Sequence, residues 1–119
     1  MLLTKSVQAK AEKSDGIRIC IMRRIQPEFE FDIWVQPLSP STELLKRYHD
    51  EEISWDEFET QLTKDVLKTQ TTFLDIVADI AIKHEVTLLC WEETPEKCHR
   101  RLVAEWIVAH RPEVKLKLN

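Results

Sequence analysis

The stretch VTLLCWEETPEKCHRRLVAEW, residues 86–106, decides the fold class. Its first six residues, VTLLCW, form a near-continuous apolar run, which is typical of a strand buried on both faces of a parallel sheet. Thr94 then has the chemistry of an N-cap, and Pro95 suits a first helical position, so we expect a helix from there to about His110. A strand that leads into a helix is the repeating unit of α/β folds.

The sequence on either side of this stretch predicts a progression of strands and helices. Its predicted elements are a strand at 17–22, a short extended segment at 29–33, a helix capped by Ser39 and ending near Tyr48, a helix capped by Ser54 with Glu57, a helix at 72–84 and a half-exposed edge strand at 114–119. We therefore expect a small three-layer α/β domain with a mostly parallel sheet of about four strands flanked by helices. Residues 1–15 are polar and are interpreted as a lead-in segment, which leaves 16–119 as a single domain.

Composition narrows the classes of function. The chain has 119 residues and a net charge of −4, so it lacks the basic excess typical of nonspecific nucleic-acid binders. Gly16 is its one glycine, which excludes a glycine-rich phosphate loop. Three cysteines without framework spacing argue against a disulfide scaffold, and no stretch resembles a signal peptide or membrane span. We expect a cytoplasmic protein without a membrane association, a cofactor or a metal.

The joint between the apolar run and the following helix concentrates reactive side chains. Cys90 ends the run, and Cys98, His99 and Arg100 follow after a short loop, so the joint should bring the two thiols and the imidazole towards one another. Such a group suits a thiol nucleophile, an anion site made of Arg100 and the backbone N–H groups after Thr94, or an incomplete three-ligand metal site. Buried cysteine and histidine also occur as ordinary packing, and that alternative stays open.

A second group of residues should lie at the same edge of the sheet. Arg23 and Arg24 follow the strand expected at 17–22, and the carboxyl ends of parallel strands share one edge. An arginine there could hold a small anion beside a thiol. Arg23 could instead pair with Asp32 and fix the proline-rich segment near Trp34.

Two stretches of the chain resemble the prokaryotic domain-of-unknown-function family 488. DIWVQPLSPSTELLKRYHDEEISWDEFETQL is similar to the family's D-x-W-x-x-x-L-x-P-S segment, and VTLLCWEETPEKCHRRLVAEWI is similar to its V-T-L-L-C…P-x-x-C-H-R signature. The signature positions in this chain are Arg23, Asp32, Trp34, Pro40, Ser41, Cys90, Cys98, His99 and Arg100. RRIQPEFEF departs from a glycine-containing W-P-R-G-like stretch of related sequences. The resemblance implies a small α/β protein of bacteria or archaea whose activity is not established.

Two classes of function fit these residues. In the first, a small-anion pocket at the strand ends carries out thiol-dependent catalysis or redox sensing, with Cys90 or Cys98 as the reactive sulfur and His99 as its base. Arg23, Arg100 and Thr94 would hold the anion, and Asp32, Trp34 and Ser41 would shape the pocket. A phosphatase loop of the C-x5-R type is excluded, because Glu96 stands where the arginine would be. In the second, the same pocket is a non-catalytic binding module for a nucleotide, a nucleic-acid end or a protein partner.

Overall fold

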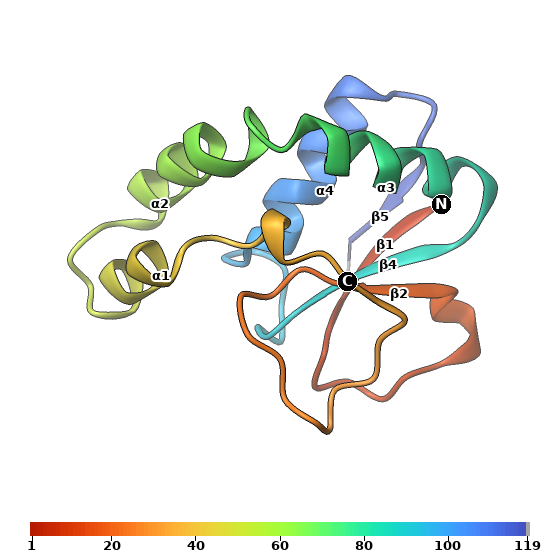
Figure 1. Ribbon diagram of the computed structural model, residues 1–119, viewed down its shortest axis with the longest axis horizontal. Helices are drawn as coiled ribbons and strands as arrows, with labels where there is room; N and C mark the ends of the chain where they lie inside the picture. The colour runs from red at the N-terminus through yellow and green to blue at the C-terminus, as the bar shows by residue number, and fades with distance from the viewer. Residues whose placement is uncertain (119) are drawn as a thin grey trace.

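The apolar run forms the central strand of a five-stranded sheet in the computed structural model, which describes residues 1–118 (Figure 1). The strands are β1 (Leu2–Ser6), β2 (Ile17–Cys20), β3 (Ile33–Trp34), β4 (Val86–Cys90) and β5 (Leu116–Lys117). They follow the order β3-β2-β4-β1-β5, and every neighbouring pair is parallel. The expected α/β class with a parallel sheet is confirmed. The strand expected at 114–119 is shorter, and Asn119 lies outside the described residues.

The helices largely follow the capping signals. They are α1 (Thr42–His49), α2 (Trp55–Leu62), α3 (Thr71–Lys83) and α4 (His99–His110), with a π-helical turn at Thr63–Leu67 and 3-10 turns at Lys13–Asp15 and Gln36–Leu38. The capping box of Ser54 and Glu57 is confirmed. The cap expected at Ser39 is wrong by two residues, because the Ser41 hydroxyl accepts the Leu44 N–H and begins α1 there.

The segment expected to be a polar lead-in contains a strand of the sheet interior. β1 lies between β4 and β5, and Leu2 and Thr4 are fully buried. The charge of Lys5 suggested a solvent-exposed segment. In the structure its Nζ donates to the carboxylate of Asp15 at 3.0 Å instead. Asp15 is itself buried, and its main-chain oxygen accepts the Thr87 hydroxyl of β4. An internal ion pair therefore lets a lysine-bearing segment join the sheet.

The strand order explains why the helices gather on one face. The chain moves in one direction along the sheet from β1 to β2 to β3, and in the other from β3 to β4 to β5. Right-handed crossovers place connections of opposite direction on opposite faces. Accordingly α3 and α4 contact each other and β4, whereas the two N-terminal connections cover the other side as loops (Figure 1). The carboxyl ends of β2 and β4 lie side by side at one edge of the sheet.

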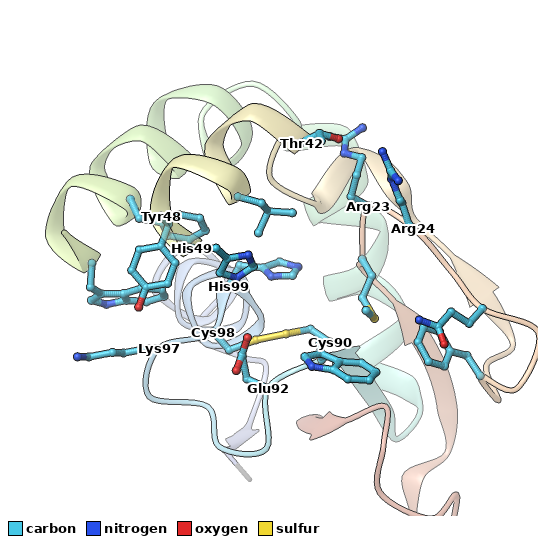
Figure 2. A pocket seen from close by; sticks show the side chains of 17 residues that line it. Arg23, Arg24, Thr42, Tyr48, His49, Cys90, Glu92, Lys97, Cys98 and His99 are labelled. Atoms are coloured by element: carbon cyan, nitrogen blue, oxygen red, sulfur yellow. A yellow bond between two sulfur atoms is a disulfide. The ribbon is translucent and has the colours of Figure 1, made fainter. Parts of the chain in front are cut away.

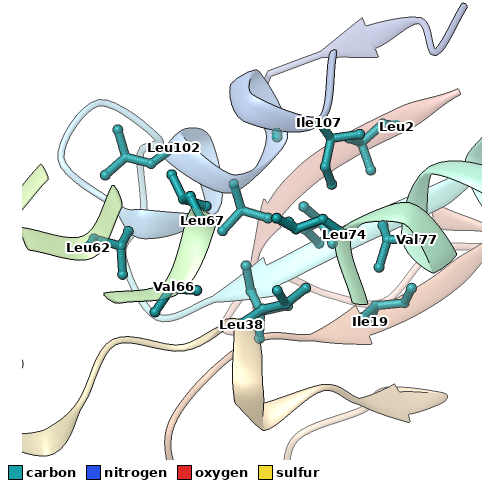
Figure 3. Packing of buried hydrophobic residues seen from close by; sticks show 14 of the residues in the cluster. Leu2, Ile19, Leu38, Leu62, Val66, Leu67, Leu74, Val77, Leu102 and Ile107 are labelled. Atoms are coloured by element: carbon teal, nitrogen blue, oxygen red, sulfur yellow. The ribbon is translucent and has the colours of Figure 1, made fainter. Parts of the chain in front are cut away.

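The hydrophobic core lies between the sheet and these helices (Figure 3). Leu2, Ile19 and Leu88 supply its floor from three adjacent strands. Buried side chains from the helices and their flanking turns close it, among them Leu38, Leu62, Val66, Leu67, Leu74, Val77, Leu102 and Ile107. Within residues 1–118, no helix combines the length and the apolar character needed to cross a membrane.

Gly16 turns the chain from the 3-10 turn at residues 13–15 into β2. Its φ is 65° and its ψ is −134°, a backbone conformation that side chains disfavour. It also packs against the backbone before β4, so that a Cβ at this position would lie 2.1 Å from the Glu85 carbonyl oxygen. The close approach keeps Ile17 N–H on the Glu85 carbonyl at 2.9 Å and so sets the register of β2 on β4.

Candidate functional site

The candidate site lies where β4 ends, at the edge of the sheet that the carboxyl ends of the strands form. Cys90 is the last residue of β4, and its sulfur is joined to that of Cys98 in a disulfide (Figure 2). The expected meeting of Cys90, Cys98 and His99 is confirmed, since one ligand atom from each lies within 4.8 Å of the others. The sequence argued against a disulfide scaffold, and the structure has one disulfide, which the sequence did not predict. A single pair cannot be read from an odd cysteine count; Cys20 is the one left over, free and buried.

Helix α4 is capped at Cys98 and begins at His99, not after a cap at Thr94 as expected. Cys98 is the N-cap residue, and residues 91–98 form a loop. Side chains from α4 hold this loop out of the helix: Arg100 Nη1 donates to the Glu92 carbonyl at 2.7 Å, and Arg101 Nε donates to the Glu96 carbonyl at 3.0 Å. The anion site expected at the N–H groups after Thr94 therefore lacks its helix N-terminus.

His99 is buried and neutral. Its Nε2 lies 2.6 Å from the carbonyl oxygen of Ile21, the residue that follows β2. A carbonyl only accepts, so Nε2 carries the hydrogen and Nδ1 of the neutral ring is an acceptor. Burial lowers the pKa of His99 to about 4, against the opposing effect of the Ile21 hydrogen bond. The ring therefore stays unprotonated at neutral pH and is a weak base, so its hydrogen bond to Ile21 holds the start of α4 against the end of β2.

Arg100 places a buried positive charge beside one of the two sulfurs. Its side chain is fully buried, and Nη1 lies 3.6 Å from Cys90 Sγ. Burial lowers the pKa of the guanidinium, and the Glu92 carboxylate acts in the opposite direction. A charge at this distance would favour a thiolate at Cys90 over a neutral thiol if the disulfide were reduced.

An apolar cavity of about 310 Å³ opens directly onto the disulfide (Figure 2). Both sulfur-bearing residues and His99 line it. The remaining walls are mainly aromatic and aliphatic, contributed by Met22, Phe29, Leu45, Tyr48, Trp55, Phe58 and Trp91. Tyr48, Trp55 and Phe58 form one packed group, in which the Trp55 and Phe58 rings stack at 5.1 Å between centroids. A cavity of this size and character is typical of a small-molecule site.

Comparison with known proteins agrees with this architecture. The family model DUF488-N3a, described as the active DUF488-N3 subclade, matches residues 2–111. This chain belongs to the DUF488 family. It is also 31% identical over 109 residues to the uncharacterised protein YeaO of Escherichia coli (strain K12), which covers 87% of this chain and 93% of YeaO. No solved structure matches the chain significantly.

Arg23 and Arg24 of this DUF488 protein both line the cavity, and Arg23 has a structural role as well. Arg23 lines the cavity, and its guanidinium donates to the carbonyls of Pro40 and Ser39. It fixes the proline-rich segment through these carbonyls rather than through Asp32. Arg24 lines the cavity from an exposed position.

Four other residues of the predicted site lie apart from the disulfide. Asp32 accepts the backbone N–H of Arg18 at 2.8 Å, so it joins the loop before β3 to β2. Trp34 donates from Nε1 to the Met22 carbonyl, and Ser41 caps α1. Thr94 lies exposed in the 91–98 loop. None of these four lines the cavity at Cys90.

Sequence reasoning missed most of the aromatic wall. The expected helices contain Tyr48, Trp55 and Phe58, but none of these three residues was predicted to belong to the site. Their i,i+3 spacing and the short turn between α1 and α2 were the available signals, since two short helices joined closely present adjacent aromatic faces. Which end of the sheet they cover depends on long-range packing.

The same three residues could hold a soft metal ion only in a reduced protein. Cys90, Cys98 and His99 offer two sulfurs and a nitrogen. The sulfurs are bonded to each other in the described structure, so neither is a thiolate ligand.

The burial of His99 makes stability depend on pH in a defined window. The pKa of His99 is about 4 in the folded protein against 6.5 for the exposed group, so the unfolded chain binds the proton first as the pH falls. The stabilisation is complete above pH 6.5 and is lost progressively towards pH 4. Urea unfolding should show this group removing about 2 to 3 kcal/mol of folding free energy between pH 7.5 and pH 4.5. The His99→Gln variant should lose that part of the slope, and an unchanged slope would contradict a buried neutral imidazole.

Proposed function

We propose that this DUF488 protein is a dithiol–disulfide redox protein in which Cys90 and Cys98 exchange two electrons with a substrate bound in the cavity. The observation that carries the proposal is the disulfide itself, placed in the wall of an apolar cavity with an imidazole and a buried guanidinium beside it. A disulfide with only a structural task needs neither a cavity nor these neighbours.

The residues next to the disulfide give the two sulfurs different roles. In the reduced protein the Arg100 guanidinium would favour the Cys90 thiolate, which makes Cys90 the attacking sulfur. His99 would act as an orienting residue, because its hydrogen bond to the Ile21 carbonyl fixes the start of α4 and with it the position of Cys98. Cys98, at the N-cap of α4, would then be the resolving sulfur that closes the disulfide. A thiol reductant restores both thiols through a mixed disulfide and is itself oxidised.

The expected cytoplasmic location supports a cycling rather than a permanent bond. Disulfides of cytosolic proteins in mesophiles are usually transient and belong to catalytic or redox-sensing sites. The alternative of a binding module without thiol chemistry uses the same cavity, so the experiment must address the sulfur pair and not ligand binding.

The test is a redox titration of the folded protein. The protein is equilibrated with dithiothreitol at a series of reduced-to-oxidised ratios, alkylated with iodoacetamide, and mapped by mass spectrometry. We expect Cys90 and Cys98 to titrate together as one two-electron couple, reversibly and without unfolding. Cys20 serves as the internal control, because burial raises the pKa of its thiol and should keep it unlabelled. A pair that resists reduction until the protein unfolds would show a structural disulfide and overturn the proposal.

A further inference from the structure

The route to the sulfurs restricts what can react with them. Cys90 is 2% exposed and Cys98 is 3% exposed, and both line the cavity. A reaction partner must therefore enter the cavity and present its reacting atoms at the wall that Cys90 and Cys98 form. A bulky disulfide, whose sulfurs lie in the middle of the molecule, fits this path poorly. A hydroperoxide fits it better, because its O–O–H group projects from the carbon chain and ends in one small oxygen atom.

The walls select a substrate with an apolar body. Rings from α1, α2 and the loops after β2 and β4 line the space, including Tyr48, Trp55, Phe58 and Trp91. Burying hydrocarbon against such a surface contributes about 25 cal/mol per Å². Hydrogen peroxide offers no surface of this kind and gains nothing from these walls.

The charged side chains around the cavity are mainly positive, whereas the net charge of the whole chain is negative. Arg23, Arg24 and Lys97 bring three cations to the lining and Glu92 one carboxylate, whereas the chain as a whole carries −4. Within residues 1–118, Arg24 and Lys97 enter no hydrogen bond or ion pair with the protein. Figure 2 shows them at different sides of the opening. Cations without protein partners at the rim of an apolar cavity complement an anionic head group.

We infer that the substrate of the redox pair is an organic hydroperoxide with a hydrocarbon body and an anionic group, the chemistry of a fatty-acid hydroperoxide. The inference rests on the proposed function and adds its substrate class. The cavity would hold the hydrocarbon, Arg24 or Lys97 the carboxylate, and the hydroperoxide group would lie at Cys90.

The reaction balances with the groups present. The Cys90 thiolate attacks the terminal oxygen of the hydroperoxide, the O–O bond breaks, and Cys90 becomes a sulfenic acid. The departing alkoxide takes up the proton that the Cys90 thiol released to solvent and leaves as an alcohol. The Cys98 sulfur then attacks the sulfenic sulfur, the disulfide forms, and hydroxide leaves with the Cys98 proton as water. Two thiols are oxidised and one peroxide is reduced by two electrons; a dithiol reductant completes the cycle.

The test compares three oxidants on the reduced protein, with the disulfide formed measured by quenched alkylation and mass spectrometry. They are linoleic acid hydroperoxide, its methyl ester and hydrogen peroxide, all below micelle-forming concentrations. We expect the acid to react at least about 100-fold faster than hydrogen peroxide and about 10-fold faster than the ester. The double variant Arg24→Gln, Lys97→Gln should react with the acid only as fast as with the ester. Lys68→Gln, on an exposed lysine outside this cavity, is the matched control.

The outcomes separate the inference from the proposed function. Hydrogen peroxide reacting as fast as the organic hydroperoxides would overturn the inference and leave the redox pair standing. Equal rates for the acid and its ester in the unaltered protein would contradict the inference that the substrate carries an anionic group. A pair that neither dithiothreitol reduces nor any of the three oxidants re-forms would overturn the proposed function itself.

Discussion

The reduced Cys98→Ser variant is expected to form a lasting sulfenic acid at Cys90 on treatment with one equivalent of peroxide, and the Cys90→Ser variant is expected to form none. The two variants should differ because Arg100 lies beside Cys90. Arg100 Nη1 lies 3.6 Å from Cys90 Sγ, so the thiolate and its attack on peroxide belong to Cys90. Without Cys98, the Cys90 sulfenic acid cannot close the disulfide and persists until an added thiol attacks it. Turnover with a dithiol reductant should be lost in Cys90→Ser, whereas Cys98→Ser can still be reduced directly at Cys90.

Trapping with dimedone followed by mass spectrometry measures this directly. The unaltered protein should give little adduct, because Cys98 closes the disulfide first. Cys20 should stay unmodified in all three proteins and reports whether each variant remains folded. An adduct at Cys98 in the Cys90→Ser variant, formed as fast as that at Cys90 in Cys98→Ser, would show that Arg100 does not select the reacting sulfur.

The Gly16→Ala variant is expected to lose at least about 3 kcal/mol of folding free energy, and its melting temperature should fall by about 10 °C. A φ of 65° with a ψ of −134° strains any side chain. The added Cβ would also lie 2.1 Å from the Glu85 carbonyl oxygen and 2.7 Å from its carbonyl carbon, both backbone atoms that cannot move aside alone. Relief requires β2 to shift from β4.

Chemical denaturation compares this variant with Lys13→Ala, an exposed substitution in the same turn. The control should stay within about 0.5 kcal/mol of the unaltered protein. Equal stability of the two variants would contradict the close packing of Gly16 on Glu85. If β2 shifts, the Ile21 carbonyl moves with it and His99 loses its partner, so the thiol chemistry should weaken as well.

The parts of the fold that the sequence predicted depend on local signals. The buried run of β4 and the capping box at Ser54 each lie within a few residues, and both are confirmed. The meeting of Cys90 with Cys98 was predictable for the same reason, since one short loop joins them. β1 was missed because the partner that neutralises Lys5, Asp15, lies ten residues away and is itself buried.

The parts of the site that escaped prediction depend on contacts between distant segments. The start of α4 was placed too early because the Arg100 contact with the Glu92 carbonyl competes with a helix cap at Thr94, and sequence patterns do not register it. The aromatic wall needs α1 and α2 to fold over the end of β4. The disulfide needed the distance between two sulfurs, which no count of cysteines supplies.

The intrinsic fluorescence of Trp91 should report the state of the disulfide. It follows Cys90 directly, lines the cavity, is 46% exposed, and its ring lies 6.2 Å from that of Phe29 between centroids. Disulfides quench the emission of a neighbouring indole, and thiols do so less. Opening and closing of the Cys90–Cys98 bond should therefore brighten and dim the native protein, so that its oxidation state can be followed in real time without a label.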